Sequence, residues 1–255
     1  MEVSDVISAQ SAGIPTSLGT GVTMDRALEV DHLGVRFGNV QPLHDLSFSL
    51  PPGATLAVIG PNGSGKTVLF RALIGALPHE GTVRWAAGTR FGYVPQKLDL
   101  ERDLPLSGLD LLRARAGLAR AAPTELQRTL TRVGLPWERA AAPIGALSGG
   151  QFHLLLFAFA LIGDPPVLLL DEPTGGVDEP GQERLQELLR QLRAEQRATI
   201  LLISHELSLV TGHATHVLCL GRGRAWFGPP GEVLTSETLQ QAFGAPVSVH
   251  VHRDH

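Results

Sequence analysis

The chain has 255 residues, of which 43% are apolar, which is enough for a sizeable core and too many for a disordered polyelectrolyte. Its 21 basic and 25 acidic side chains give a formal net charge of −4, which argues against a general nucleic-acid coat. The single cysteine, Cys219, excludes an intramolecular disulfide framework and a cysteine-cluster metal site, and it favours a reducing compartment.

The two ends of the chain lack the patterns of regular structure. Residues 1–24 are rich in Ser, Ala, Gly and Thr, without a basic n-region or an apolar h-region, so we expect a flexible leader and no signal peptide. Residues 247–255 contain His250, His252 and His255. Weak metal binding by these histidines is one interpretation, but a solvated tail is favoured because no fourth ligand or fixed scaffold is evident.

The first half of the chain predicts strands followed by a helix. Short alternating runs in residues 27–50 predict antiparallel strands. The continuous apolar run at residues 55–59 predicts a strand that is buried on both faces. Apolar residues at helix spacing follow at positions 69–74, after a glycine-rich loop.

From residue 99 to residue 147 the character changes to leucines spaced three and four apart, which predicts a helical insertion. The longest apolar run, residues 154–163, is half the length that a bilayer requires, so we expect no transmembrane helix. An amphipathic helix is predicted at residues 185–192. Strand-like runs return at 167–170, 199–203 and 217–220. Strands that alternate with helices predict a mainly parallel sheet covered on both faces.

The glycine-rich loop matches the pattern G-x-x-x-x-G-K-[ST]. It consists of Gly60, Pro61, Asn62, Gly63, Ser64, Gly65, Lys66 and Thr67. Glycines let the backbone curl around phosphates with its N–H groups pointing inward, and the following helix N-terminus adds partial positive charge. Lys66 supplies a charge for the β- and γ-phosphates, and the Thr67 hydroxyl can ligate Mg²⁺. The motif indicates nucleotide binding without distinguishing a kinase, an ATPase or a GTPase.

Two acidic residues, Asp171 and Glu172, end the apolar strand at residues 167–170. At the carboxyl end of a strand beside a phosphate loop, Asp171 can hold Mg²⁺ directly or through water. Glu172 can orient and deprotonate the attacking water, a role typically worth about 10²–10⁴-fold in rate. Alone, such a pair would as often be two solvated acids, but the phosphate loop in the same chain favours the catalytic interpretation.

Residues 147–151 read Leu-Ser-Gly-Gly-Gln and precede the acidic pair by 20 residues. This order resembles the ATP-binding subunits of ABC transporters, whose LSGGQ signature it reproduces. Gln96, Asp178 and His205 fall where that family has its Q-loop glutamine, its D-loop aspartate and its switch histidine. Phe37 falls where the family places an aromatic ring under adenine. Taken singly, Gln96 would be a surface residue, His205 a loop residue and Phe37 a core residue, and only their joint order favours the family roles.

The resemblance implies an α/β P-loop NTPase of ABC type, with a mainly parallel sheet, an N-terminal antiparallel β part and an inserted helical subdomain. The implied RecA-like core comprises residues 25–98 and 148–246, and the implied signature subdomain comprises residues 99–147. ATP and Mg²⁺ are the implied cofactors. The family forms a head-to-tail homodimer, in which the signature of one subunit caps the ATP held by the other. The signature residues in this sequence are Ser148, Gly149, Gly150 and Gln151.

The resemblance also implies roles for single residues. Gln96 reaches Mg²⁺ and the attacking water, and His205 hydrogen-bonds the γ-phosphate. Asp178 lies on the dimer seam. Leu154 and Phe159 stand where the family usually has arginines, which leaves open a nucleotide-binding regulator with little turnover.

The segments 92–97, 103–106 and 203–207, with the ending at 228–234, resemble the bacterial zinc and manganese importers. This likeness implies integral membrane permease subunits, an extracytoplasmic substrate-binding protein and a place at the cytoplasmic face of the membrane. Two alternatives are an import ATPase for another substrate, such as an iron complex, and a non-transport ABC module that acts on nucleic acid or ribosomes. The net charge of −4 and the absence of a long coiled-coil insertion disfavour the second.

Overall fold

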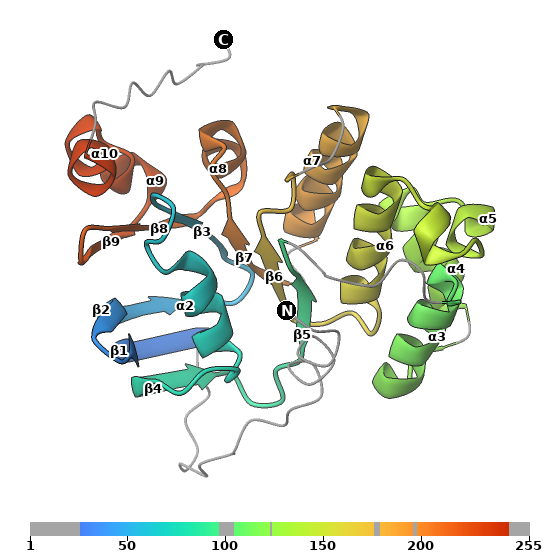
Figure 1. Ribbon diagram of the computed structural model, residues 1–255, viewed down its shortest axis with the longest axis horizontal. Helices are drawn as coiled ribbons and strands as arrows, with labels where there is room; N and C mark the ends of the chain where they lie inside the picture. Colours follow the sequence, from blue (N-terminus) through green and yellow to red (C-terminus); the bar gives the residue numbers. More distant parts are fainter. Residues whose placement is uncertain (1–25, 97–104, 123, 176–178, 196–197, 245–255) are drawn as a thin grey trace. The chain divides into compact units, whose positions relative to one another are not determined.

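The computed structural model describes residues 26–96, 105–122, 124–175, 179–195 and 198–244 (Figure 1). The expected leader, the histidine tail and Asp178 lie outside these residues. The chain divides into two compact units. The first unit contains the described residues between 88 and 200. The second unit contains the described residues of 26–87 and 201–244. Within the described ranges, no helix combines the length and the apolar character needed to cross a membrane.

In the second unit, the chain begins with an antiparallel sheet in the order β2-β1-β4. Its strands are β1 (Leu28–Phe37), β2 (Val40–Leu50) and β4 (Glu80–Trp85). The sequence predicted β1 and β2 but not β4. The Trp85 indole donates a hydrogen bond of 2.8 Å to the Leu73 carbonyl, which ties β4 to the helix of the glycine-rich loop.

The same unit holds a second sheet, in which β3 (Thr55–Ile59) pairs in parallel with β8 (His216–Gly221). β9 (Arg224–Gly228) extends it in the antiparallel direction. The helices of this unit are α2 (Lys66–Leu73), α8 (Leu207–His213), α9 (Pro230–Val233) and α10 (Ser236–Phe243). Cys219 lies buried in β8 within an apolar cluster, and this burial raises the pKa of its thiol to about 11.

In the first unit, β5 (Phe91–Val94) and β6 (Val167–Asp171) pair in parallel, and every residue of both strands is buried. The strand β7 (Thr199–Ile203) runs from this unit into the second. Its first residue donates to the Pro166 carbonyl at 2.9 Å in the first unit, and the residue after its end, Ser204, donates to the Val58 carbonyl at 3.4 Å in the second.

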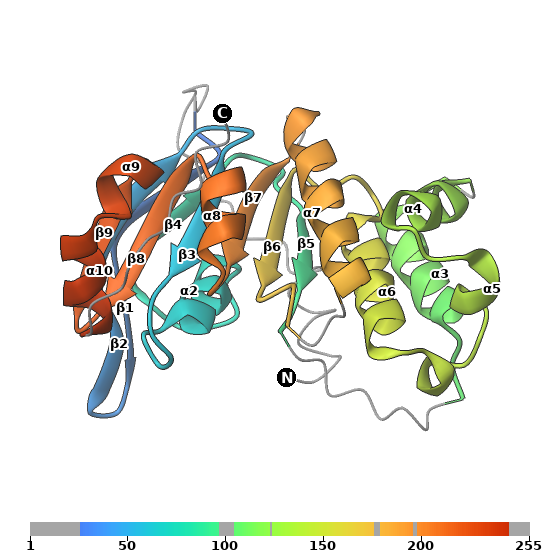
Figure 2. The same ribbon diagram turned by 90° about the horizontal axis from the view of Figure 1, so that it is seen from above.

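The remaining helices belong to the first unit. They are α3 (Gly108–Ala119), α4 (Glu125–Val133), α5 (Trp137–Ala140), α6 (Gly149–Leu161) and α7 (Glu179–Ala194), with a short 3₁₀ helix η1 (Ile144–Ala146). Figures 1 and 2 show α3, α4 and α5 grouped on one side of α6, and α3 and α4 contact α6 directly. The helix α6 contacts α3, α4 and β5. Its side chains are apolar on almost every side, as expected of a helix that is surrounded by other elements, and they do not form the single apolar stripe of a surface helix. The expected α/β fold, with antiparallel and mainly parallel sheets flanked by helices, is confirmed.

Candidate functional site

The glycine-rich loop of the second unit connects β3 to α2 and depends on backbone conformations that favour glycine. Gly60, Gly63 and Gly65 have φ angles of 146°, 79° and 95°. A β-carbon on Gly60 would lie 2.1 Å from the Leu220 carbonyl oxygen, and one on Gly65 would lie 2.9 Å from a methyl group of Leu43. The loop is therefore held against both β8 and β2, and a side chain at Gly60 or Gly65 would displace it.

The first helical residue, Lys66, folds its side chain back over this loop. It is 7% exposed, and its ammonium group donates hydrogen bonds of 2.9 Å and 3.0 Å to the carbonyls of Gly60 and Pro61. The helix α2 begins at Gly65 without a side-chain cap, so its first N–H groups remain available to a ligand. The Ser64 hydroxyl is buried and has no hydrogen-bond partner among the described residues. A buried donor, an uncapped helix and an adjacent ammonium group fit a polyphosphate.

His205 lies in the turn between β7 and α8, in the same unit as the loop. The Ser204 hydroxyl accepts a hydrogen bond of 3.0 Å from the Glu206 backbone and closes this turn. The backbone of Ser204 is bonded to Val58, two residues before Gly60. The structure thus brings the histidine turn and the phosphate loop to neighbouring strand ends, and it leaves the His205 side chain exposed.

Phe37 ends β1 opposite Val40, at the tip of the hairpin with β2. Its side chain is 49% exposed. The core position expected of an isolated phenylalanine is therefore wrong, because the hairpin tip extends beyond the packed part of the sheet. β2 contacts the phosphate loop through Pro42 and Leu43, which approach Gly65. An exposed ring on this hairpin can stack on a flat ligand.

The acidic pair of the first unit lies at the carboxyl end of β6. Asp171 is 2% exposed, whereas Glu172 adopts a left-handed backbone with φ of 48°. The Gly175 N–H donates to the Glu172 carbonyl at 3.0 Å and closes a tight turn. The Gln96 amide donates a hydrogen bond to the Glu172 carboxylate, which joins two predicted catalytic residues that are 76 positions apart in the sequence. An unusual backbone at a carboxylate is typical of functional sites, where strain is maintained by the surroundings.

The signature turn in the same unit starts α6. Ser148 is its N-cap and forms a capping box with Gln151, in which the Gln151 backbone donates to the serine hydroxyl at 3.2 Å and the Ser148 backbone donates to the glutamine side chain at 3.2 Å. Ser148 and Gly149 are exposed, and Gly150 is half-buried. The exposed N–H groups of this turn can bind an anion from outside.

A contact between α6 and the acidic turn connects these two parts of the first unit. The imidazole of His153, on α6, faces the backbone carbonyl of Pro173. Burial lowers the pKa of His153, and hydrogen bonding to that carbonyl opposes part of the effect. The signature helix therefore packs against the residue that follows Glu172.

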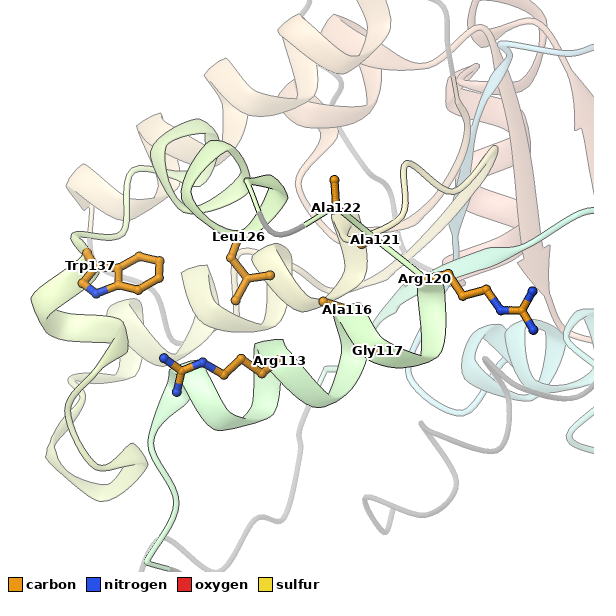
Figure 3. A pocket seen from close by; sticks show the side chains of 8 residues that line it. All are labelled: Arg113, Ala116, Gly117, Arg120, Ala121, Ala122, Leu126 and Trp137. Atoms are coloured by element: carbon orange, nitrogen blue, oxygen red, sulfur yellow. The ribbon is translucent and has the colours of Figure 1, made fainter.

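The described residues of the first unit line at least two cavities. One, of about 300 Å³, is lined by signature residues Ser148, Gly150 and Gln151 together with Arg184 of α7. The other, of about 350 Å³, lies between α3, α4 and α5 (Figure 3), where the Arg113 and Trp137 side chains lie near each other and Arg120 points away. None of the predicted site residues lines this second cavity.

The predicted metal ligands are all oxygen donors: the Thr67 hydroxyl, the Gln96 amide and the Asp171 carboxylate. Hard oxygen ligands are those that Mg²⁺ prefers in nucleotide sites, so the donor set fits this ion. The described residues contain no cluster of three or more histidine, cysteine, aspartate or glutamate side chains that would suit a transition metal. Taken together, the loop, the carboxylates and the signature turn are those of a P-loop nucleotide-binding protein.

Comparison with known proteins gives the family. The sequence profile of the family described as ABC transporter matches residues 43–175. The zinc import ATP-binding protein ZnuC of Cereibacter sphaeroides is 41% identical over 214 residues, which cover 84% of this chain and 86% of that protein. The protein of the same name from Pseudomonas putida is 39% identical over 236 residues, which cover 91% of this chain and 90% of that protein. Among solved structures, an inward-facing metal-chelate type ABC transporter aligns with a TM-score of 0.77 at 29% identity, covering 87% of this chain and 90% of that one.

The chain belongs to the ABC transporter family, and it is an ATP-binding subunit with ATPase activity. The resemblance inferred from the signature and its neighbouring motifs is thereby confirmed.

Proposed function

We propose that this chain hydrolyses ATP to energise zinc import through a separate membrane permease. The relatives that match most of its length are zinc import ATP-binding proteins, and this likeness supports zinc over manganese or an iron complex. One structural observation carries the hydrolytic part of the proposal: the Gln96 amide contacts the Glu172 carboxylate at the end of β6. A carboxylate held in this way is suited to act on a water molecule.

The phosphate loop binds the triphosphate in this proposal. The ammonium group of Lys66 exchanges the loop carbonyls of Gly60 and Pro61 for the β- and γ-phosphate oxygens. Thr67, Asp171 and Gln96 offer the oxygen ligands that would hold Mg²⁺, and the ion would supply positive charge to offset that of the triphosphate. The remaining loop residues, Asn62, Gly63, Ser64 and Gly65, surround the phosphates with backbone and hydroxyl donors.

Glu172 orients and deprotonates the attacking water. Gln96 limits the rotation of this carboxylate, and His205 donates a hydrogen bond to the γ-phosphate as negative charge is redistributed in the transition state. The exposed ring of Phe37 stacks on adenine.

Two copies of the chain form a head-to-tail dimer in this proposal. Ser148, Gly149, Gly150 and Gln151 of one copy contact the ATP that is bound by the other. Support comes from the exposure of Ser148 and Gly149 at the N-terminus of α6, where the helix dipole and backbone N–H groups favour an anion. Asp178 lies on the seam between the copies.

The permease, and an extracytoplasmic protein that delivers the metal, complete the transporter. The chain acts at the cytoplasmic face of the membrane, where ATP is present. Zinc is the cargo in this scheme, and the part of the chain that the structure describes holds no cluster of three or more metal-binding side chains for it.

Reconstitution of the full chain with its permease in lipid vesicles tests the proposal. ATP turnover and uptake of radiolabelled zinc are measured with zinc, with manganese and with an iron chelate outside the vesicles. We expect zinc to stimulate turnover and to accumulate inside. If manganese or the iron chelate alone stimulated ATP turnover, that metal would take the place of zinc as the proposed cargo. Co-purification with nucleic acid in place of a membrane protein would favour the non-transport alternative.

A further inference from the structure

A buried arginine of the first unit has no role in the proposed chemistry. Arg115 lies on α3 and is 7% exposed. No described carboxylate lies within ion-pair distance of it, and its Nε atom has no hydrogen-bond partner among the described residues. Burial lowers the pKa of this guanidinium, repulsion by Arg90 lowers it further, and the more distant Glu125 carboxylate opposes both. An apolar side chain would be less costly to bury here, so the retained charge needs a reason.

The contacts of Arg115 are made to the strand that leads to Gln96. Its Nη2 atom donates a long hydrogen bond of 3.5 Å to the carbonyl of Phe91, the first residue of β5. Its guanidinium lies over the Phe159 ring of α6, 5.8 Å from the ring centre. One side chain therefore connects α3, β5 and α6.

β5 is short and lies at the edge of its sheet. It has four residues, and among the described residues β6 is the strand that pairs with it. A β-carbon on Gly92 would lie 2.2 Å from the Ala160 carbonyl of α6, which leaves no space for β5 to move toward that helix. Arg115 restrains β5 from α3.

The position of β5 determines the position of Gln96. Only Pro95 separates the last residue of β5, Val94, from this glutamine. A displacement of the strand along its axis would move the Gln96 amide away from the Glu172 carboxylate that it contacts. Misplacement of a catalytic group by about 1 Å can cost about a hundredfold in rate.

We propose that Arg115 is a positioning residue for ATP hydrolysis, which holds β5 so that Gln96 meets Glu172. The inference rests on the proposed roles of Gln96 and Glu172. It assigns to a buried charge in the helical part of the chain an effect on the rate of a reaction that it does not touch.

Arg115→Met tests the inference in the full chain, because methionine keeps an unbranched apolar stem out to about the position of Nε and removes the guanidinium donors. We expect kcat for ATP to fall about tenfold and KM to change less than about twofold, since the phosphate loop is unaltered. Arg115→Lys, which restores a buried charge and a donor, should recover most of the turnover. Arg113→Met is the matched control, because Arg113 is exposed on the same helix and pairs with Asp110 at 3.4 Å. It should leave kcat unchanged.

A double-mutant cycle separates positioning from general destabilisation. In a Gln96→Ala background, Arg115→Met should lower kcat by less than about twofold further, because both changes remove the same interaction. Multiplicative losses would overturn the inference, as would equal impairment of the lysine and methionine variants. If Arg115→Met does not fold, Arg115→Gln replaces it, with an expected loss of about threefold that again disappears in the Gln96→Ala background.

The single variants distinguish this inference from the proposed function. Normal turnover in Glu172→Gln would refute the proposed catalytic base. Normal turnover in Gln96→Ala, with Glu172→Gln inactive, would overturn the role of Arg115 and leave the catalytic base in place.

Discussion

The N-termini of two helices, α2 and α6, differ in how they are capped. α2 starts at Gly65 in a left-handed conformation, has no side-chain cap and carries the buried ammonium group of Lys66. α6 starts at Ser148, is closed by a capping box with Gln151 and is exposed. Both ends offer backbone N–H groups to an anion, but the first adds a buried ammonium group and an enclosing loop of its own.

The difference indicates that the two helix ends bind an anion in different ways. The N-terminal end of α2 has no side-chain cap and is preceded by the phosphate loop, so it is suited to bind the triphosphate within one chain. The end of α6 is already stable as a helix terminus, so it gains from an anion that is presented to it from outside. This is the arrangement expected of a nucleotide that is held by one copy and covered by another.

The largest effect is expected from Glu172→Gln. In this variant ATP should stay bound at the N-terminus of α2 in one copy and at the N-terminus of α6 in the other. Removal of the carboxylate should slow hydrolysis by about 10²–10⁴-fold and leave ATP affinity nearly unchanged, because the phosphate loop is intact. ATP should then accumulate a stable dimer in light scattering. A variant that turns over normally would show that another group activates the water.

Lys66→Ala addresses the end of α2 alone. Loss of a charge-assisted contact worth about 1.5–3 kcal/mol should weaken ATP binding by about tenfold to about a hundredfold. Titration with a fluorescent ATP analogue measures the change. Arg224→Ala, on the exposed strand β9 of the same unit, removes a positive charge elsewhere and should have no effect. Equal affinities of the two variants would contradict the role of the loop.

Ser148→Arg addresses the end of α6. The variant should bind ATP in the single chain and fail to form the ATP-driven dimer, because a bulky cation occupies the signature turn. Ser107→Arg is a matched control, since Ser107 is the N-cap of α3 and forms the same kind of capping box with Asp110. Both changes should cost about 1 kcal/mol of stability through loss of the cap. Dimerisation of both variants with ATP would refute the shared site.

The smallest effect is expected on the pH dependence of stability, which should differ between the capping box of α3 and that of α6. Hydrogen bonds from the Ser107 side chain and backbone lower the pKa of Asp110 below its ordinary value of 3.8. A lowered pKa gives stability that is present above 3.8 and is lost as the pH falls through the folded-state value. The box of α6 uses the neutral Gln151 and should not titrate. Thermal unfolding of wild type and Asp110→Asn between about pH 6 and about pH 3 should converge at the acidic end.

The sequence allowed the motifs to be placed because each depends on local chemistry. The loop at 60–67 needs glycine conformations and a lysine at set spacing, and Asp171 and Glu172 follow an apolar run that forms only a buried strand. The antiparallel pairing of β1 and β2 was predictable from alternation. The fold followed from these patterns, and the structure confirms it.

Tertiary contacts were not predictable in the same way. β4 and β5 are short and are defined by their partners, and no local period marks them. The meeting of Gln96 with Glu172 depends on how β5 lies beside β6. The burial of Arg115 depends on Phe91 and Phe159, which contact it from distant parts of the chain. From the sequence alone, Arg115 would have been assigned to the solvent face of its helix, as is right for Arg113.

Cys219 has a practical consequence for experiments on this chain. The thiol is buried in β8, and this burial raises its pKa to about 11, so alkylating reagents at neutral pH should find almost no reactive thiolate. Cysteines introduced at exposed positions of the phosphate loop and the signature turn would then be the sole sites of labelling or cross-linking in the native protein. Distances between two copies can be followed by spectroscopic probes without first replacing the natural cysteine.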